Sequence, residues 1–363
     1  MTQSAPPHTP DVRRFKWLAF TATLFTYLLI VVGGVGVRVT GSGMGCGDDW
    51  PLCNGALFPP LAPPILIPLL HRFATVLVTL LIIGAAFVAW RDYRRVRWIV
   101  WPALWAMALL VVQILLGAAT VRLALHPVIV AVHFGNALVL LALLITATVV
   151  AFQLEKDPRV GDSLLHFDAV SSLAGAAMLG VYALLVTGAI VVGSRASTAC
   201  AGWPLCDGSF APATLPGLLN MGHRYVAGAV GLMAVGAVVQ AWRLRRDDIP
   251  VVVASAVTGM LFAGEVLVGR ENVLRGLPLL VNGLHSALAA AVWASIVVFA
   301  VLAMQYVRLS PLKFAARRAA RSKLRVATAF GDAFALAWPV LAAWSQALRA
   351  AARRHYRILL RRV

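Results

Sequence analysis

The chain is dominated by long apolar runs that are separated by short polar segments. Eight runs reach about 20 residues, the length that an α-helix needs to cross about 30 Å of hydrocarbon. They lack the strict alternation of a barrel strand, and a helix satisfies its own backbone hydrogen bonds in lipid. The pattern therefore predicts eight transmembrane helices, near residues 16–37, 68–90, 98–120, 127–152, 167–192, 218–242, 250–269 and 278–305.

Composition supports this interpretation. The 363 residues are 61% hydrophobic, and the mean hydropathy is +0.84, which excludes an ordinary soluble domain. The fold class expected is an all-α integral membrane protein.

The distribution of Lys and Arg predicts the orientation. With the N-terminus inside, most of the 32 basic residues fall on the inner side, and only Arg38, Arg122, Arg195, Arg270 and Arg275 fall in outer loops. The positive-inside rule then predicts a multi-pass protein of the cell membrane, with both termini in the cytoplasm and the cysteine-containing loops outside.

The net charge of +18 is concentrated in the C-terminal tail, residues 306–363, which holds thirteen Lys and Arg and one acid, Asp332. A basic cluster beside a membrane span is explained by anionic lipid of the inner leaflet, so no nucleic-acid partner is expected. Residues 326–348 are apolar but interrupted by Asp332 and Pro339, which favours a helix lying on the membrane surface over a ninth span.

The four cysteines form two close pairs in the outer loops, Cys46 with Cys53 and Cys200 with Cys206. An oxidising compartment favours two disulfides over free thiols. A zinc site is a weaker alternative, because no histidine stands beside either pair.

Landmarks in the first half of the chain recur in the second. LLHRFA at 69–74 matches MGHRYV at 221–226, QILLG at 113–117 matches EVLVG at 265–269, and the segments around His133 and His285 also match, each at an offset of 152 residues. We therefore expect two tandem, parallel four-helix bundles, since each copy has an even number of spans. The predicted domains are a cytoplasmic segment at 1–15, bundles at 16–153 and 167–305 joined by a linker at 154–166, and the tail at 306–363.

Four of the eight histidines belong to this repeat: His71 and His133 in the first half, His223 and His285 in the second. We expect His71 and His223 about one turn below the outer boundary, and His133 and His285 about two turns below it. A single buried histidine is ordinarily a hydrogen-bonded packing residue, but two equivalent pairs inside apolar bundles favour axial ligation of an iron porphyrin. Zinc is a weaker alternative, because two ligands do not complete a tetrahedral site.

Arg72 and Arg224 directly follow two of these histidines, at the outer rim. Two interpretations stand side by side: pairing with a haem propionate, or extension of the side chain to lipid phosphate.

Together these residues resemble the haem A synthase family, whose members oxidise a methyl group of haem O to the formyl group of haem A. The resemblance covers residues 16–305, and its most specific segments are TGSGMGCGDDWPLCNG at 40–55, HR at 71–72, QILLGAATV at 113–121 with His133, and the second-half segments CAGWPLC, HR at 223–224 and His285.

The resemblance implies that His223 and His285 ligate a resident haem b, and that His71 and His133 receive the substrate haem O. It also implies disulfides at Cys46–Cys53 and Cys200–Cys206, and partnership with haem O synthase and with the assembly machinery of cytochrome oxidase. A homo-oligomer is left open.

One position departs from the family pattern. The family carries a catalytic glutamate three residues before the first histidine, and Pro68 stands there. The catalytic residue is therefore unknown, and Asp48 and Asp49 in the preceding loop are weak candidates. Glu265, the acid placed deepest in a predicted span, is expected to pair with Arg224 or Arg270 or to tune the resident haem.

Three functions remain open on the sequence. The first is an active haem A synthase. The second is a non-catalytic haem-binding member that serves as a carrier or oxidase-assembly factor, which Pro68 favours. The third is a bis-histidine cytochrome b that transfers electrons.

Overall fold

The computed structural model describes residues 12–158, 160 and 166–305. All eight predicted spans are confirmed as helices long and apolar enough to cross a membrane. The first span is composite: α1 (Val12–Leu28) continues through a π-helical segment (Leu29–Gly34) into α2 (Val35–Val39). The others are α3 (Pro63–Asp92), α4 (Arg97–Arg122), α5 (Pro127–Lys156), α6 (Ala169–Gly193), α7 (Leu215–Leu244), α8 (Ile249–Leu274) and α9 (Leu279–Met304).

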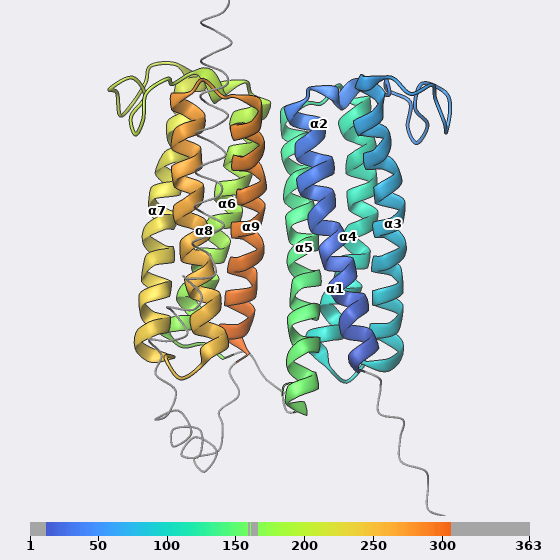
Figure 1. Cartoon of the computed structure of the whole chain (residues 1–363), viewed down its shortest axis with the longest axis vertical. Helices are drawn as coiled ribbons and strands as arrows, with labels where there is room; N and C mark the ends of the chain where they lie inside the picture. The colour runs from blue at the N-terminus through green and yellow to red at the C-terminus, as the bar shows by residue number, and fades with distance from the viewer. Residues whose placement is uncertain (1–11, 159, 161–165, 306–363) are drawn as a thin grey trace, which may run out of the picture. The chain divides into compact units, whose positions relative to one another are not determined.

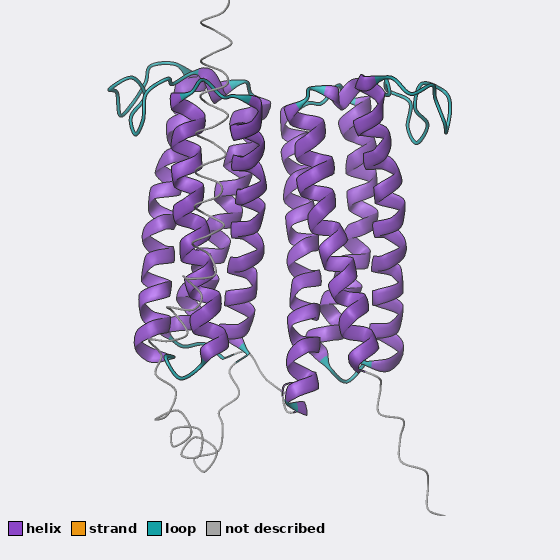
Figure 2. Ribbon diagram, viewed as in Figure 1, coloured by secondary structure: helices purple, strands orange, loops and turns teal. Residues whose placement is uncertain are grey.

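The described residues contain helices and loops but no strand, as Figure 2 shows. The expected all-α class is therefore confirmed. The predicted surface helix at 326–348 lies outside the described residues.

The helices form two groups (Figure 1). In the first group, α1 packs against α3 and α5, and α4 packs against both α3 and α5. In the second group, α6 packs against α7 and α9, and α8 packs against both α7 and α9. The groups meet where α5 lies against α6 and α9, and where α2 touches α9. The domain boundaries given above stay predictions.

Small side chains allow this close packing. Ala85 and Ala89 of α3, Ala106 of α4, and Ala237 and Ala241 of α7 are almost fully buried. Lipid tails are as apolar as leucine, so helices in a membrane associate mainly through close van der Waals contact, which small residues permit. Where the two groups meet, larger and partly polar side chains make the contact. The indole of Trp293 donates a hydrogen bond of 2.9 Å to the carbonyl of Leu138, and its ring lies 5.8 Å from the ring of Tyr182.

The start of α6 is fixed by Asp168. Its carboxylate accepts hydrogen bonds from the backbone of Val170 and Ser171, and the Ser171 hydroxyl accepts from the backbone of Asp168, which completes a capping box. The same carboxylate accepts from Nε of Arg245, at the end of α7, at 3.1 Å. Burial by itself would raise the pKa of Asp168, but the hydrogen bonds from Ser171 and Arg245 outweigh it, so the pKa lies below the usual 3.8.

Replacing Asp168 with Ala is expected to destabilise the protein by about 1 kcal/mol, because the cap hydrogen bonds are lost. Because the pKa of Asp168 is lower in the folded state than in the unfolded state, Asp168 stabilises the folded state at pH values above its unfolded-state pKa. This contribution disappears as the pH falls through its folded-state pKa. Thermal unfolding in detergent should therefore separate the variant from the unaltered protein at pH 7, with a smaller difference near pH 3. Asp48→Ala is the control, since Asp48 is exposed in a loop; an equal effect of both changes would contradict this role.

Candidate functional site

The four repeated histidines all lie near the end of the helices that carries the cysteine loops, the upper end in Figure 1. His71 and His223 follow the first residues of α3 and α7 by eight positions, or about 12 Å, and His133 and His285 follow those of α5 and α9 by six, or about 9 Å. The depths of the histidines below the outer membrane boundary stay predictions, because the start of a helix does not fix that boundary. Helix α3 begins at Pro63, since prolines are tolerated in the first turn, and α7 begins at Leu215, so both helices start earlier than the apolar runs indicated.

Each imidazole packs against a glycine of a neighbouring helix. His71 faces Gly33 in the π-helical segment, and His133 faces Gly117 of α4. In the second group, His223 faces Gly188 of α6, and His285 faces Gly269 of α8. A methyl group at Gly188 or Gly269 would lie 3.1 or 3.0 Å from Cε1 of the facing ring, and one at Gly33 would collide with the ring of His71. Gly33, Gly188 and Gly269 thus provide the space in which three of the rings sit, whereas a methyl group at Gly117 would lie 3.4 Å from Cε1 of His133, an ordinary contact.

The histidines of each group also lie within electrostatic range of each other, His71 with His133 and His223 with His285. Within residues 12–158, 160 and 166–305, no cluster of three His, Cys, Asp or Glu side chains is arranged to hold a metal ion. Each group therefore offers two nitrogen donors rather than a closed tetrahedral shell, which fits the two axial positions of a porphyrin iron.

The ring nitrogens support this fit. The buried Nδ1 atoms of His71 and His133 make no hydrogen bond to any part of the chain that the structure describes. Nδ1 of His223 lies 3.1 Å from the hydroxyl of Thr187, a contact of the kind that orients an imidazole whose other nitrogen binds a metal.

A polar side chain accompanies the second histidine of each group. The amide nitrogen of Gln113 lies 3.3 Å from Nε2 of His133, and its oxygen accepts a hydrogen bond of 2.7 Å from Asn136. At the equivalent place, Oε1 of Glu265 lies 2.8 Å from Nδ1 of His285. The expected pairing of Glu265 with Arg224 or Arg270 is therefore wrong.

Arg72 and Arg224 hold the cysteine loops. Nη1 of Arg72 donates to the carbonyls of Asp49 (3.0 Å) and Leu52, and Nη1 of Arg224 donates to those of Gly202 (2.7 Å) and Pro204 (3.1 Å). Neither interpretation of these arginines from the sequence included this role. The sequence did carry a sign of this role, because each HR pair recurs together with a WPLC loop. It does not show which loop carbonyls lie within reach of the arginine.

Both loops are closed by the predicted disulfides, Cys46–Cys53 and Cys200–Cys206, and contain the cis peptide bonds Trp50–Pro51 and Trp203–Pro204. The alternatives of free thiols and a zinc site are thereby excluded for these four cysteines. Each disulfide packs on the helix below it: Cys46 and Cys53 contact Leu69, and Cys200 and Cys206 contact Met221.

Pro68 is buried within α3, one turn before His71. Because proline has no N–H, the carbonyl of Pro64 loses its helical donor, and Gly45 of the first cysteine loop packs against that carbonyl. Asp48 and Asp49 are exposed in the loop. Among the described residues, neither carboxylate hydrogen-bonds to His71, so the candidate acids are not brought to the site.

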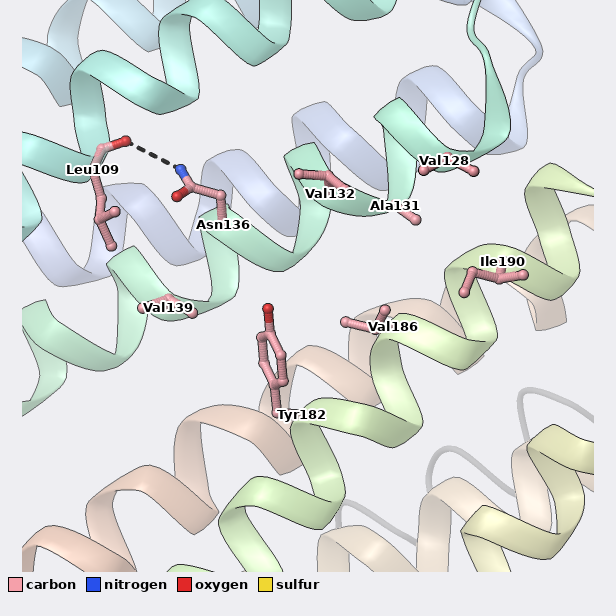
Figure 3. A pocket seen from close by; sticks show the side chains of 9 residues that line it. All are labelled: Leu109, Val128, Ala131, Val132, Asn136, Val139, Tyr182, Val186 and Ile190. Atoms are coloured by element: carbon pink, nitrogen blue, oxygen red, sulfur yellow. Dashed lines mark hydrogen bonds between the residues drawn. The ribbon is translucent and has the colours of Figure 1, made fainter.

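A pocket of about 400 Å³ lies where the groups meet, apart from the histidine pairs (Figure 3). Aliphatic side chains of α4, α5 and α6 line it, together with two polar residues, Asn136 and Tyr182. Asn136 donates to the Leu109 carbonyl at 3.1 Å and to Gln113, so hydrogen bonds connect the pocket wall with the neighbour of His133.

Comparison with known proteins identifies the family. Residues 16–297 match the family model described as cytochrome oxidase assembly protein. The chain belongs to this family.

Relatives in the family include proteins named "Heme A synthase". The one from Geobacillus kaustophilus (strain HTA426) is 30% identical over 313 residues, which cover 84% of this chain and 95% of that protein. The one from Bacillus cereus (strain 03BB102) is 33% identical over 296 residues, which cover 78% and 91%. The one from Geobacillus thermodenitrificans is 31% identical over 278 residues, which cover 76% and 86%.

Removing the guanidinium of Arg224, by Arg224→Gln, should free the second cysteine loop. Charge-assisted hydrogen bonds contribute about 1.5–3 kcal/mol each, so amides in residues 199–208 should exchange hydrogen at least about tenfold faster. The exposed Arg243 at the other end of α7 gives the control, Arg243→Gln, which should leave the loop unchanged. Unaltered exchange in Arg224→Gln would show that the disulfide alone holds the loop.

Proposed function

We propose that this protein is a haem A synthase, which oxidises the methyl group of haem O to the formyl group of haem A for the assembly of cytochrome oxidase. The observation that carries the proposal is the arrangement of two histidine pairs, each ring seated against a glycine, in a chain of this family. Two successive oxidations convert the methyl group to an alcohol and the alcohol to a geminal diol, which loses water to give the aldehyde. Each oxidation adds one oxygen atom at the level of water and removes two electrons and two protons, and the electrons would leave through the resident haem to an electron acceptor.

The second helix group supplies the site for a resident haem b. His223 and His285 would hold it, and they fit this role because Gly188 and Gly269 provide room for the rings and Thr187 orients one of them. Such a haem, when bound, supplies one-electron redox chemistry, and the protein tunes it through its surroundings. Glu265 places an acidic group against His285, where a carboxylate makes an imidazole more electron-donating.

The first helix group receives haem O between His71 and His133. The π-helical turn widens the backbone at Leu29–Gly34, where Gly33 meets His71, and such turns are frequent at functional sites. On the other side, Gln113 and Asn136 fix the surroundings of His133. These contacts orient the substrate ligands, and no residue is assigned to move the proton that leaves the methyl carbon.

The proposed orientation follows from the charge distribution. The cysteine loops lie outside the cytoplasm, both termini lie inside, and the basic tail meets anionic lipid. The common offset of 152 residues, the paired disulfides and the paired His–Gly contacts support an internal duplication into bundles at 16–153 and 167–305. Haem O synthase and the oxidase-assembly machinery are the proposed partners.

A second function is favoured by one observation: Pro68 occupies the position of the family glutamate, and the described structure brings no other acid to His71. On this alternative the protein binds haem O and carries it without oxidising it.

Cells that co-express this protein with a source of haem O distinguish the two functions. We expect their extracted pigment to contain haem A or its alcohol precursor, identified by pyridine haemochrome spectra and chromatography. His133→Ala should abolish the conversion while the haem b signal of the purified protein stays, because His133 belongs to the substrate site. His126→Ala, an exposed histidine just before α5, is the control and should convert haem O normally. Unchanged haem O bound to the unaltered protein would support the carrier instead.

A further inference from the structure

Arg38 lies in the last turn of α2, at the end of the first span. Its side chain is partly buried and crosses to the other helix group, where Nη2 donates a hydrogen bond to the hydroxyl of Ser286 in α9. Helix α2 packs against α9 at this point. A cation of the first group therefore reaches the residue that directly follows His285.

This cation has no anionic partner among the residues that the structure describes. Within the described ranges, its side chain makes only the bond to Ser286, a neutral hydroxyl. Four other arginines near this end of the helices are engaged: Arg72 and Arg224 bind loop carbonyls, and Arg270 and Arg275 pair with Glu271. A guanidinium has five N–H donors, and a partly buried charge without a counter-ion is costly, so Arg38 is prepared to receive an anion.

The position identifies which anion fits. A haem carries two propionate carboxylates at one edge of the macrocycle, and arginine binds a carboxylate with two parallel hydrogen bonds. Ser286 is the residue after His285, so the guanidinium lies at the same turn of α9 as this proposed haem ligand. Glu265 is not the anion that Arg38 binds in the described structure, because its carboxylate lies against His285.

We propose that Arg38 binds a propionate of the haem held by His223 and His285. The proposal rests on the haem b site inferred above. A residue of the first helix group thus completes the cofactor site of the second, which makes cofactor binding depend on contact between the groups. Arg38 is a binding and tuning residue, since its charge also stabilises the reduced, less positive iron.

The test uses the purified full-length protein with Arg38→Gln, and two quantities are measured: the rate at which haem b passes to excess apomyoglobin, and the midpoint potential of the bound haem. We expect haem loss to become about tenfold faster, because one charge-assisted interaction is removed, and the midpoint potential to fall. Arg122→Gln is the matched control, an exposed arginine in the last turn of α4 at the same end of the helices, and should change neither quantity.

Two further variants separate a specific effect from misfolding. Arg38→Lys keeps the charge but loses the two-point contact, so it should retain a midpoint potential close to that of the unaltered protein while still losing haem faster. Ser286→Ala removes only the hydroxyl partner and should leave the potential unchanged. If Arg38→Gln loses haem b at the same rate as the unaltered protein and has the same midpoint potential, the proposal is overturned.

Two other outcomes also overturn it. If Arg38→Gln weakens haem O binding but leaves haem b unaffected, the propionate belongs to the substrate instead. If Arg38→Lys matches Arg38→Gln in midpoint potential, the charge is not what acts. An unaltered protein that holds no bis-histidine haem would instead contradict the proposed function, which keeps the two failures distinguishable.

Discussion

The structure depends on the space that a glycine leaves for an imidazole between two antiparallel helices. A bundle in lipid is held by close contact between small side chains, and a histidine ring is too large and too polar for such an interface unless the facing residue has no side chain. At Gly33, Gly188 and Gly269 a side chain would crowd the facing ring, whereas a methyl group at Gly117 would lie at an ordinary contact distance of 3.4 Å from His133. The ligand geometry is therefore built by residues that carry no functional group.

A second set of contacts ties each histidine to the loop above it. The arginine that follows His71 or His223 turns its guanidinium toward the backbone of a disulfide-closed loop. In each helix group, the proposed iron ligand is thus followed directly by the arginine that binds the backbone of the cysteine loop. This coupling explains why the HR pair and the WPLC loop recur together, and why the arginines are not free to bind a propionate, whereas Arg38 is.

Much of this was predictable from the sequence. The length of the apolar runs predicted all eight spans, and the close pairing of Cys46 with Cys53 and of Cys200 with Cys206 predicted the two disulfides. The starts of α3 and α7 were predicted too late, at residues 68 and 218, because hydropathy does not reveal that prolines extend the start of α3. The partners of Glu265, Arg72 and Arg38 also escaped prediction. Each is a contact between segments far apart in sequence, and a long polar side chain can reach in several directions.

The central claim, that glycine-seated imidazole pairs ligate porphyrin iron, is tested most directly by electron paramagnetic resonance of the oxidised, purified protein. The account predicts a low-spin ferric signal typical of two imidazole ligands, which converts to a high-spin signal in Gly188→Val because a side chain there displaces the ring of His223. In protein purified from cells that make no haem O, a low-spin signal that survives both Gly188→Val and His223→Ala would contradict it, since the iron of haem b would then be held by other residues.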